Sequence, residues 1–93
     1  MGPAWANTDV PRPLPSVQCA VLDGDAVLYD VASGRAMLLN ASAASVWGML
    51  GRLSVAELVE ELAAAHEMDA ADLHSDLLRV LEQLEDGGAL APR

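Results

Sequence analysis

Residues 17–40, VQCAVLDGDAVLYDVASGRAMLLN, decide the fold of this 93-residue chain. Two apolar runs, 17–22 and 26–31, lie on either side of Asp23-Gly24. An Asp-Gly pair between two apolar runs is a strong signal for a β-hairpin with a two-residue turn. This half of the stretch therefore predicts two antiparallel strands.

A third strand is predicted over residues 35–40. It follows the three-residue loop 32–34, in which Gly34 can supply the positive φ that such a loop needs. Because a half-buried strand has one polar face, and both faces here are largely apolar, we expect another element to cover the second face or the edge. Side chains alternate along a strand, which places Arg35, Met37 and Leu39 on one face and Ala36, Leu38 and Asn40 on the other.

From residue 40 onward the apolar residues recur at helical spacing. Asn40 is a favourable N-cap for a helix over roughly 41–50. Ser54 and Glu57 form a capping box for a second helix over about 55–66. These signals predict two short helices joined by a tight loop.

A third helix is capped by Asp69 and runs to about residue 86, where Gly87-Gly88 ends it. The predicted order of elements is therefore β-β-β-α-α-α. We predict a domain of the α+β class over residues 17–90. Its architecture is winged-helix-like, with a three-stranded antiparallel meander followed by three helices.

Residues 1–16 contain four prolines and no hydrophobic period. Each proline removes a backbone donor and biases the preceding residue toward extended conformations. We predict a Pro-rich N-terminal tail, extended or disordered, with a docking point near residues 13–16. Trp5 is interpreted as an incidental tail residue.

The net charge of −9 limits the classes of partner. The five basic residues are all arginines, scattered among fourteen carboxylates, whereas a nucleic-acid binder needs a clustered basic footprint. The same charge disfavours an anionic membrane surface. With no signal peptide and no long apolar run, we expect a cytoplasmic protein that binds neither nucleic acid nor membrane.

No pattern in the chain points to catalysis or to a metal. Cys19 alternates in phase with Val17 and Val21, which favours packing over a nucleophilic role. The acidic residues between His66 and His74 have neither zinc-site nor EF-hand spacing. We therefore expect no catalytic residue, no metal and no cofactor, and interpret the protein as a non-enzyme.

The sequence does indicate a groove for a peptide. The third strand lies at an edge of the predicted sheet and has no charge, proline or bulge within it, which leaves it open to an added strand. On a helical wheel of the third helix, Leu78 falls outside the core stripe, on the same flank as His74. The predicted peptide-binding residues are Arg35, Ala36, Met37, Leu38 and Leu39 of the strand, and His74, Leu77, Leu78 and Leu81 of the helix, of which Leu77 and Leu81 also suit a core position.

The chain resembles the PqqD-like precursor-recognition domains of pathways for ribosomally synthesised and post-translationally modified peptides (RiPPs). The resemblance spans roughly residues 17–90. The matching pattern comprises Ser33-Gly34-Arg35, Leu39-Asn40, Ala43-Ala44 and Val46-Trp47, then Ser54-Val55-Ala56-Glu57-Leu58, then Leu81, Leu84, Gly88 and Leu90.

This resemblance implies a peptide-binding function. Such domains hold the leader of a precursor peptide as an added strand on the third strand, against the third helix, and present it to maturation enzymes. The Leu14-Pro15 lead-in and the turn over residues 30–34 resemble free-standing members of lasso-peptide pathways, which work with a leader peptidase and a cyclase. Lasso-type members often have aromatic residues in the third strand, where this chain has Ala36 and Met37.

Three other readings stay open at this point. One is a PqqD-type chaperone for a radical SAM enzyme in another RiPP pathway. Another is a winged-helix DNA-binding regulator, which a mobility-shift assay at low salt would reveal. The last is a homodimer that pairs through the edge of the third strand, which concentration-dependent sedimentation would reveal.

Overall fold

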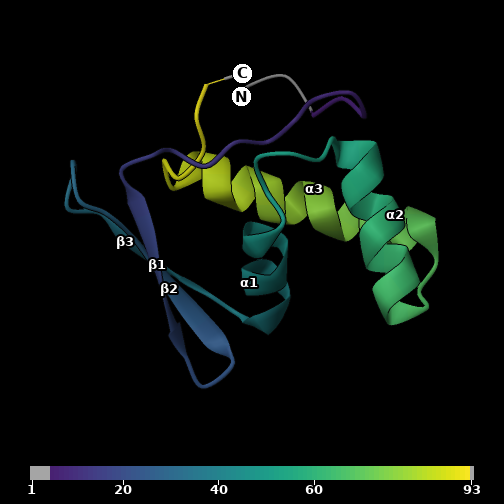
Figure 1. Ribbon diagram of the computed structural model, residues 1–93, viewed down its shortest axis with the longest axis horizontal. Helices are drawn as coiled ribbons and strands as arrows, with labels where there is room; N and C mark the ends of the chain where they lie inside the picture. The colour runs from purple at the N-terminus through teal and green to yellow at the C-terminus, as the bar shows by residue number, and fades with distance from the viewer. Residues whose placement is uncertain (1–4, 93) are drawn as a thin grey trace.

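The computed structural model describes residues 5–92 and confirms the predicted order of elements. The sheet lies at one side of the molecule and the helices at the other, with α1 between them (Figure 1). The elements are β1 (Val17–Leu22), β2 (Asp25–Asp30), β3 (Ala36–Leu39), α1 (Ala41–Gly48), α2 (Val55–His66) and α3 (Ala70–Asp86).

The three strands form an antiparallel meander in the order β1-β2-β3. Asp23 and Gly24 both have positive φ, at 44° and 91°, as a type I′ hairpin turn requires. Because this turn has only two residues, β2 begins at Asp25, one residue earlier than predicted. Gly34 has a φ of 76°, which confirms its predicted role in the second turn.

The helices begin where the capping residues predict. Asn40 and Asp69 accept from backbone N–H groups in the first turns of α1 and α3. Ser54 and Glu57 make both bonds of the capping box at α2. α1 ends at Gly48, two residues before the predicted end, because the chain turns there and the Met49 N–H donates to the Val46 carbonyl at 3.0 Å.

The core lies between the inner face of the sheet and the three helices. α1 packs on β2 and β3, and α3 packs on α1 and α2. β1 has no comparable helix contact, and Val21 on that strand is 76% exposed. The fully buried leucines of the core are Leu28, Leu39, Leu58, Leu77, Leu81 and Leu84.

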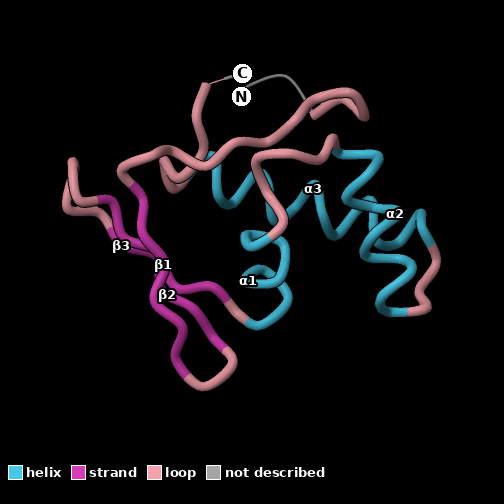
Figure 2. The backbone as a smooth tube through the Cα atoms, in the orientation of Figure 1, coloured by secondary structure: helices cyan, strands magenta, loops and turns pink. Residues whose placement is uncertain are grey.

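The N-terminal segment (residues 5–16) contacts the rest of the domain well before residues 13–16, where docking was predicted, since Trp5 and Pro11 are buried and the segment bonds to the start of α2. It crosses above α3 before it enters β1 (Figure 2). Trp5 is only 6% exposed and belongs to the core, so its interpretation as an incidental residue is wrong. Residues 1–4 of the predicted tail lie outside the described residues.

Backbone hydrogen bonds explain why this segment is ordered. The carbonyls of Asn7 and Asp9 accept from the N–H groups of Ala56 and Val55, at 3.1 and 2.9 Å. These two donors stand in the first turn of α2, where a helix has no internal acceptor for them. Further along, the segment pairs with the C-terminal residues, since the Leu14 N–H donates to the Ala89 carbonyl and the Ala91 N–H donates to the Arg12 carbonyl.

Candidate functional site

β3 is a free edge of the sheet within the described part of the chain. The Asp30 N–H donates to the Arg35 carbonyl at 2.8 Å, and β2 and β3 continue from that pair in regular antiparallel register. Because such pairs alternate between hydrogen-bonded and non-bonded positions, the backbone groups of Met37 face β2. Those of Ala36 and Leu38 face outward, where an added strand can bond to them.

The side chains of β3 divide between the two faces of the sheet as predicted. Leu39 is fully buried and Met37 is partly buried on the face toward the helices. Leu38 is 64% exposed on the other face, and Ala36 is also exposed. No element among residues 5–92 covers that outer face, so the expected cover over the second face of β3 is not found there.

The beginning of β3 is closed off by the end of α3. A Cβ placed on Gly87 would lie 2.8 Å from the Met37 sulfur, and one placed on Gly88 would lie 3.3 Å from Nη1 of Arg35. Strand and helix are therefore in direct contact at this end. A small cavity of about 10 Å³, lined in part by Arg35, Ala36 and Met37, remains at this end, and a much larger opening lies at the other end of β3, toward α1.

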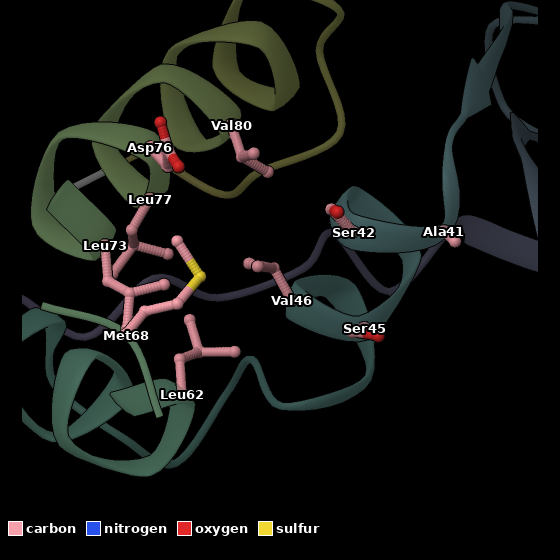
Figure 3. Close-up of a pocket in the computed structure, with 10 residues that line it drawn as sticks. All are labelled: Ala41, Ser42, Ser45, Val46, Leu62, Met68, Leu73, Asp76, Leu77 and Val80. Atoms are coloured by element: carbon pink, nitrogen blue, oxygen red, sulfur yellow. The ribbon is translucent and has the colours of Figure 1, made fainter. Parts of the chain in front are cut away.

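An apolar cleft of about 320 Å³ opens there, between α1, the end of α2 and α3 (Figure 3). Only Asn40 separates β3 from α1, and the first two residues of α1 already line the cleft. The free edge of β3 therefore leads toward the cleft. The residues that line this α1–α3 cleft are Ala41, Ser42, Ser45, Val46, Leu62, Met68, Leu73, Asp76, Leu77 and Val80.

α3 presents one flank to the cleft and the other to the N-terminal segment. Nε2 of His74 lies 3.1 Å from Oδ1 of Asn7. Leu78 follows one turn later on the same flank and is partly buried against the core. Two of the predicted peptide-binding residues, His74 and Leu78, are therefore not among those that line the cleft.

The remaining predicted residues occupy different positions around the edge and the cleft. Leu77 lines the cleft and is almost fully buried, whereas Leu39 and Leu81 are fully buried in the core beneath it. Arg35 is exposed and lies against the end of α3. None of the five strand residues from 35 to 39 is among those that line the cleft.

The flank of α3 that lines the cleft, with Asp76 and Val80, was not among the predicted binding residues. Asp76 and Val80 lie about 60° and 20° from Leu73 on the helical wheel, on the side away from Leu78. Val80 lies at the edge of the core stripe, where burial is the ordinary expectation, and Asp76 has no sequence signal of its own. Met68 is 47% exposed, and its side chain extends into the cleft between Leu73 and Leu62 (Figure 3). Its place just before the cap of α3 is the sequence feature that could have indicated it.

Three polar residues, Ser42, Ser45 and Asp76, interrupt the apolar lining of the cleft. Asp76 is the only charged one. Nη1 of Arg79 lies 3.8 Å from Oδ1 of Asp76, and both side chains are largely exposed. A surface pair at this distance contributes little to stability, so the Asp76 carboxylate remains available to a stronger partner.

Asp30 holds the turn that leads into β3. A hydrogen bond from the Ser16 hydroxyl, together with one from the Ala32 N–H, lowers the pKa of this carboxyl below its ordinary value. The Ser33 hydroxyl also donates to Asp30 at 3.0 Å. These bonds fix the conformation of the chain just before the free edge begins.

Within residues 5–92, leaving His66 aside, no three side chains of His, Cys, Asp or Glu gather in a way that suits a metal ion. The helices in this part of the chain are also too short or too polar for any of them to cross a membrane. The site consists of a strand edge and an apolar cleft.

Solved structures with this fold include two leader-peptide complexes. TbiB1 in complex with the TbiA(beta) leader peptide is 24% identical, with 88% of this chain and 96% of that chain covered and a TM-score of 0.76. Lasso peptide synthetase B1 complexed with a leader peptide is 27% identical, with 90% and 100% covered and a TM-score of 0.76.

A third structure is the PqqD truncation of Methylobacterium extorquens PqqCD, described as a stand-alone RiPP recognition element. It is 25% identical to this chain, with 96% of each chain covered and a TM-score of 0.80. No curated protein sequence matches this chain. The family described as Coenzyme PQQ synthesis protein D (PqqD) matches residues 25–90, and the chain therefore belongs to the PqqD family.

Proposed function

We propose that this protein binds the leader segment of a ribosomally synthesised precursor peptide as a fourth strand on β3. The observation that carries the proposal is the continuity of the site, since an edge with outward-facing backbone groups leads toward an apolar cleft. Two of the similar structures contain a leader peptide, which supports the same assignment.

The two parts of the site have different tasks. The backbone groups of Ala36 and Leu38 bond to the leader and supply affinity that is largely independent of its sequence. The cleft accepts an apolar leader side chain and supplies selection. Leu77 contacts that side chain, while Leu39 and Leu81 support the site from beneath and Arg35 borders it at the α3 end.

The protein performs no chemical step and presents the bound leader to a maturation enzyme. We assign it to a lasso-peptide pathway, in which that enzyme is a leader peptidase that acts with a cyclase. The similarity to lasso peptide synthetase B1 over the whole of that chain supports this choice. The similarity to the PqqD truncation favours the second candidate, a chaperone for a radical SAM enzyme of another RiPP pathway.

An NMR titration tests the binding site. The probes are synthetic leader peptides from short open reading frames next to this gene, with lasso-type and PQQ-type leaders as separate arms. We expect saturable shifts in residues 36–42 and in Asp76, Leu77 and Val80. If no leader binds at micromolar concentrations, or if the shifts avoid these residues, the proposal is wrong.

Leu38→Pro tests the strand addition. Its N–H faces outward, so the substitution removes a donor that β2 does not use, and edge strands tolerate proline at such positions. We expect leader affinity to fall by at least about tenfold, because proline also disturbs the register of the added strand. Affinity is measured by fluorescence anisotropy with a labelled leader, and thermal unfolding verifies that the variant is folded.

Val21→Pro is the matched control on the opposite edge. Val21 pairs with Ala26 at a non-bonded position, so its N–H also faces away from β2. We expect this variant to keep wild-type affinity. Equal losses of affinity in the two variants would argue against strand addition at β3. If no leader binds and sedimentation shows a dimer that Leu38→Pro abolishes, the homodimer is favoured instead.

A further inference from the structure

Asp76 is the charged residue among those that line the apolar α1–α3 cleft. Resting on the proposed function, we propose that the site selects leaders with a lysine or arginine two residues from the apolar anchor. The apolar side chain occupies the α1–α3 cleft and the basic side chain pairs with the carboxylate of Asp76. The proposal identifies the class of leader and a specificity-determining residue.

The spacing follows from the geometry of helix and strand. Asp76 lies about one turn from Leu73 and from Val80 on α3, and one turn of an α-helix rises about 5.4 Å. In an extended peptide, residues two apart point to the same side and lie about 7 Å apart. Asp76 lies beside Leu77 on α3 (Figure 3). We infer that a peptide with one side chain among the apolar residues of the cleft places the side chain two residues away near the Asp76 carboxylate.

The charges around the site favour a cation. Among the side chains that the structure describes, those that line the cleft include one carboxylate and no basic group, and the chain as a whole carries −9. Long-range attraction therefore favours the approach of a basic peptide to the protein, and Asp76 is the charge that it meets in the cleft. An acidic side chain in the same place would meet Asp76 directly, which disfavours acidic leaders.

Arg79 is the competitor that a basic leader has to displace. Its guanidinium lies 3.8 Å from Asp76, with 79% of the Arg79 side chain exposed. A contact this long and this exposed is weak. Backbone pairing on β3 already holds the leader's lysine or arginine near Asp76. Pairing with the carboxylate then costs little further conformational entropy, so the leader residue replaces Arg79 as its partner.

A double-mutant cycle tests the pair. The probe is the leader identified by the titration above, prepared with Lys, Gln or Glu at each position two residues from its anchor. With the wild-type protein we expect the order Lys, Gln, Glu at one of these positions, with about two- to fivefold in affinity per step. With Asp76→Asn we expect the three peptides to bind within about a factor of two.

Two further variants sharpen the result. Arg79→Gln removes the competitor, and we expect it to tighten binding of the Lys peptide. Glu82→Gln makes the same charge change as Asp76→Asn on α3 but at an exposed residue that does not line the cleft, so the order of the three peptides is expected to persist. All three substitutions concern exposed side chains, which keeps their effect on folding small.

The outcomes separate this inference from the proposed function. If the leader binds but Asp76→Asn leaves the order of the three peptides unchanged, or if Glu82→Gln removes it equally, Asp76 is not the determinant. An identified leader that prefers Glu at both positions would also overturn the inference, while leader binding itself would stand. If no leader binds at all, the proposed function fails and this inference fails with it.

Discussion

Two flanks of α3, one with Leu78 and the other with Val80, lie in different surroundings. Along the flank of His74 and Leu78 lies the N-terminal segment, bonded to His74 through Asn7. The flank of Asp76 and Val80 faces α1 and the end of α2 across the α1–α3 cleft, which stays open. One flank serves stability and the other is accessible to a ligand.

The difference teaches that an off-stripe leucine does not by itself indicate a binding surface. Leu78 lies off the stripe but is partly buried against the core, on the flank where His74 contacts Asn7 of the N-terminal segment. The open flank has a valine and a carboxylate instead. Substitutions on the two flanks are therefore expected to separate folding from binding.

The largest expected effect is on the covered side. Trp5→Ala removes a side chain that is only 6% exposed, and loss of a buried tryptophan costs about 3–5 kcal/mol. Urea denaturation measures the change in the free energy of unfolding. Val21→Ala, at a residue 76% exposed, is the control and is expected to change that free energy by under about 0.5 kcal/mol.

A loss below about 1 kcal/mol in Trp5→Ala would contradict the comparison. It would mean that the N-terminal segment contributes little to the fold, and the flank of His74 and Leu78 would then be available to a ligand as well.

Leu78→Asp probes the same flank in a second way. The substitution places a carboxylate under the N-terminal segment, where burial of a polar group without a partner costs about 1–3 kcal/mol. We expect a lower melting temperature but unchanged leader affinity of the folded protein. A clear loss of affinity at full folding would return Leu78 to the binding surface.

Val80→Asp is the counterpart on the open flank. It adds a charge to the apolar lining of the cleft, next to the charge of Asp76. We expect leader affinity to fall by about tenfold or more, with a smaller loss of stability than in Leu78→Asp. Calorimetric titration with the leader measures the affinity, and an unchanged value would remove the cleft from the binding site.

The smallest expected effect concerns pH and the start of α2, where the N-terminal segment is attached. Hydrogen bonds from the backbone and side chain of Ser54 lower the pKa of Glu57 below its ordinary value of 4.5. The resulting stabilisation is present above the ordinary value and is lost as the pH falls through the lowered pKa. Glu57→Gln should therefore reduce the loss of stability on acidification below about pH 4.5.

Chemical denaturation at pH 7 and at pH 3.5 measures this difference. Glu60→Gln, at an exposed position of the same helix, is the control. If both variants and the wild type lose the same stability on acidification, the capping carboxylate does not contribute.

Local signals predicted most of the fold because they act over a few residues. Asp23-Gly24 determined the first hairpin, and the caps at Asn40, Ser54 and Asp69 determined where the helices begin. The predicted bounds of α2 agree with the structure at both ends. Strand and helix ends near turns were less accurate, because turn length decides them.

The candidate site was only partly predictable. The free edge of β3 followed from the order of the strands, which the two turns impose. The cleft did not, since it depends on α1, α2 and α3 meeting around Val46, Met68 and Val80. No spacing of residues along the chain predicts how these three helices pack around the cleft.

The amino-acid sequence by itself determined the meander, the three helices and the acidic character of the chain. Turn residues, caps and charge are local or additive properties. Only the tertiary structure decided that Trp5 is a core residue and that the open flank of α3 is the one with Asp76. Burial depends on which distant segment covers a side chain. Here the carbonyls of Asn7 and Asp9 accept hydrogen bonds from the start of α2 and hold the N-terminal segment against the helices.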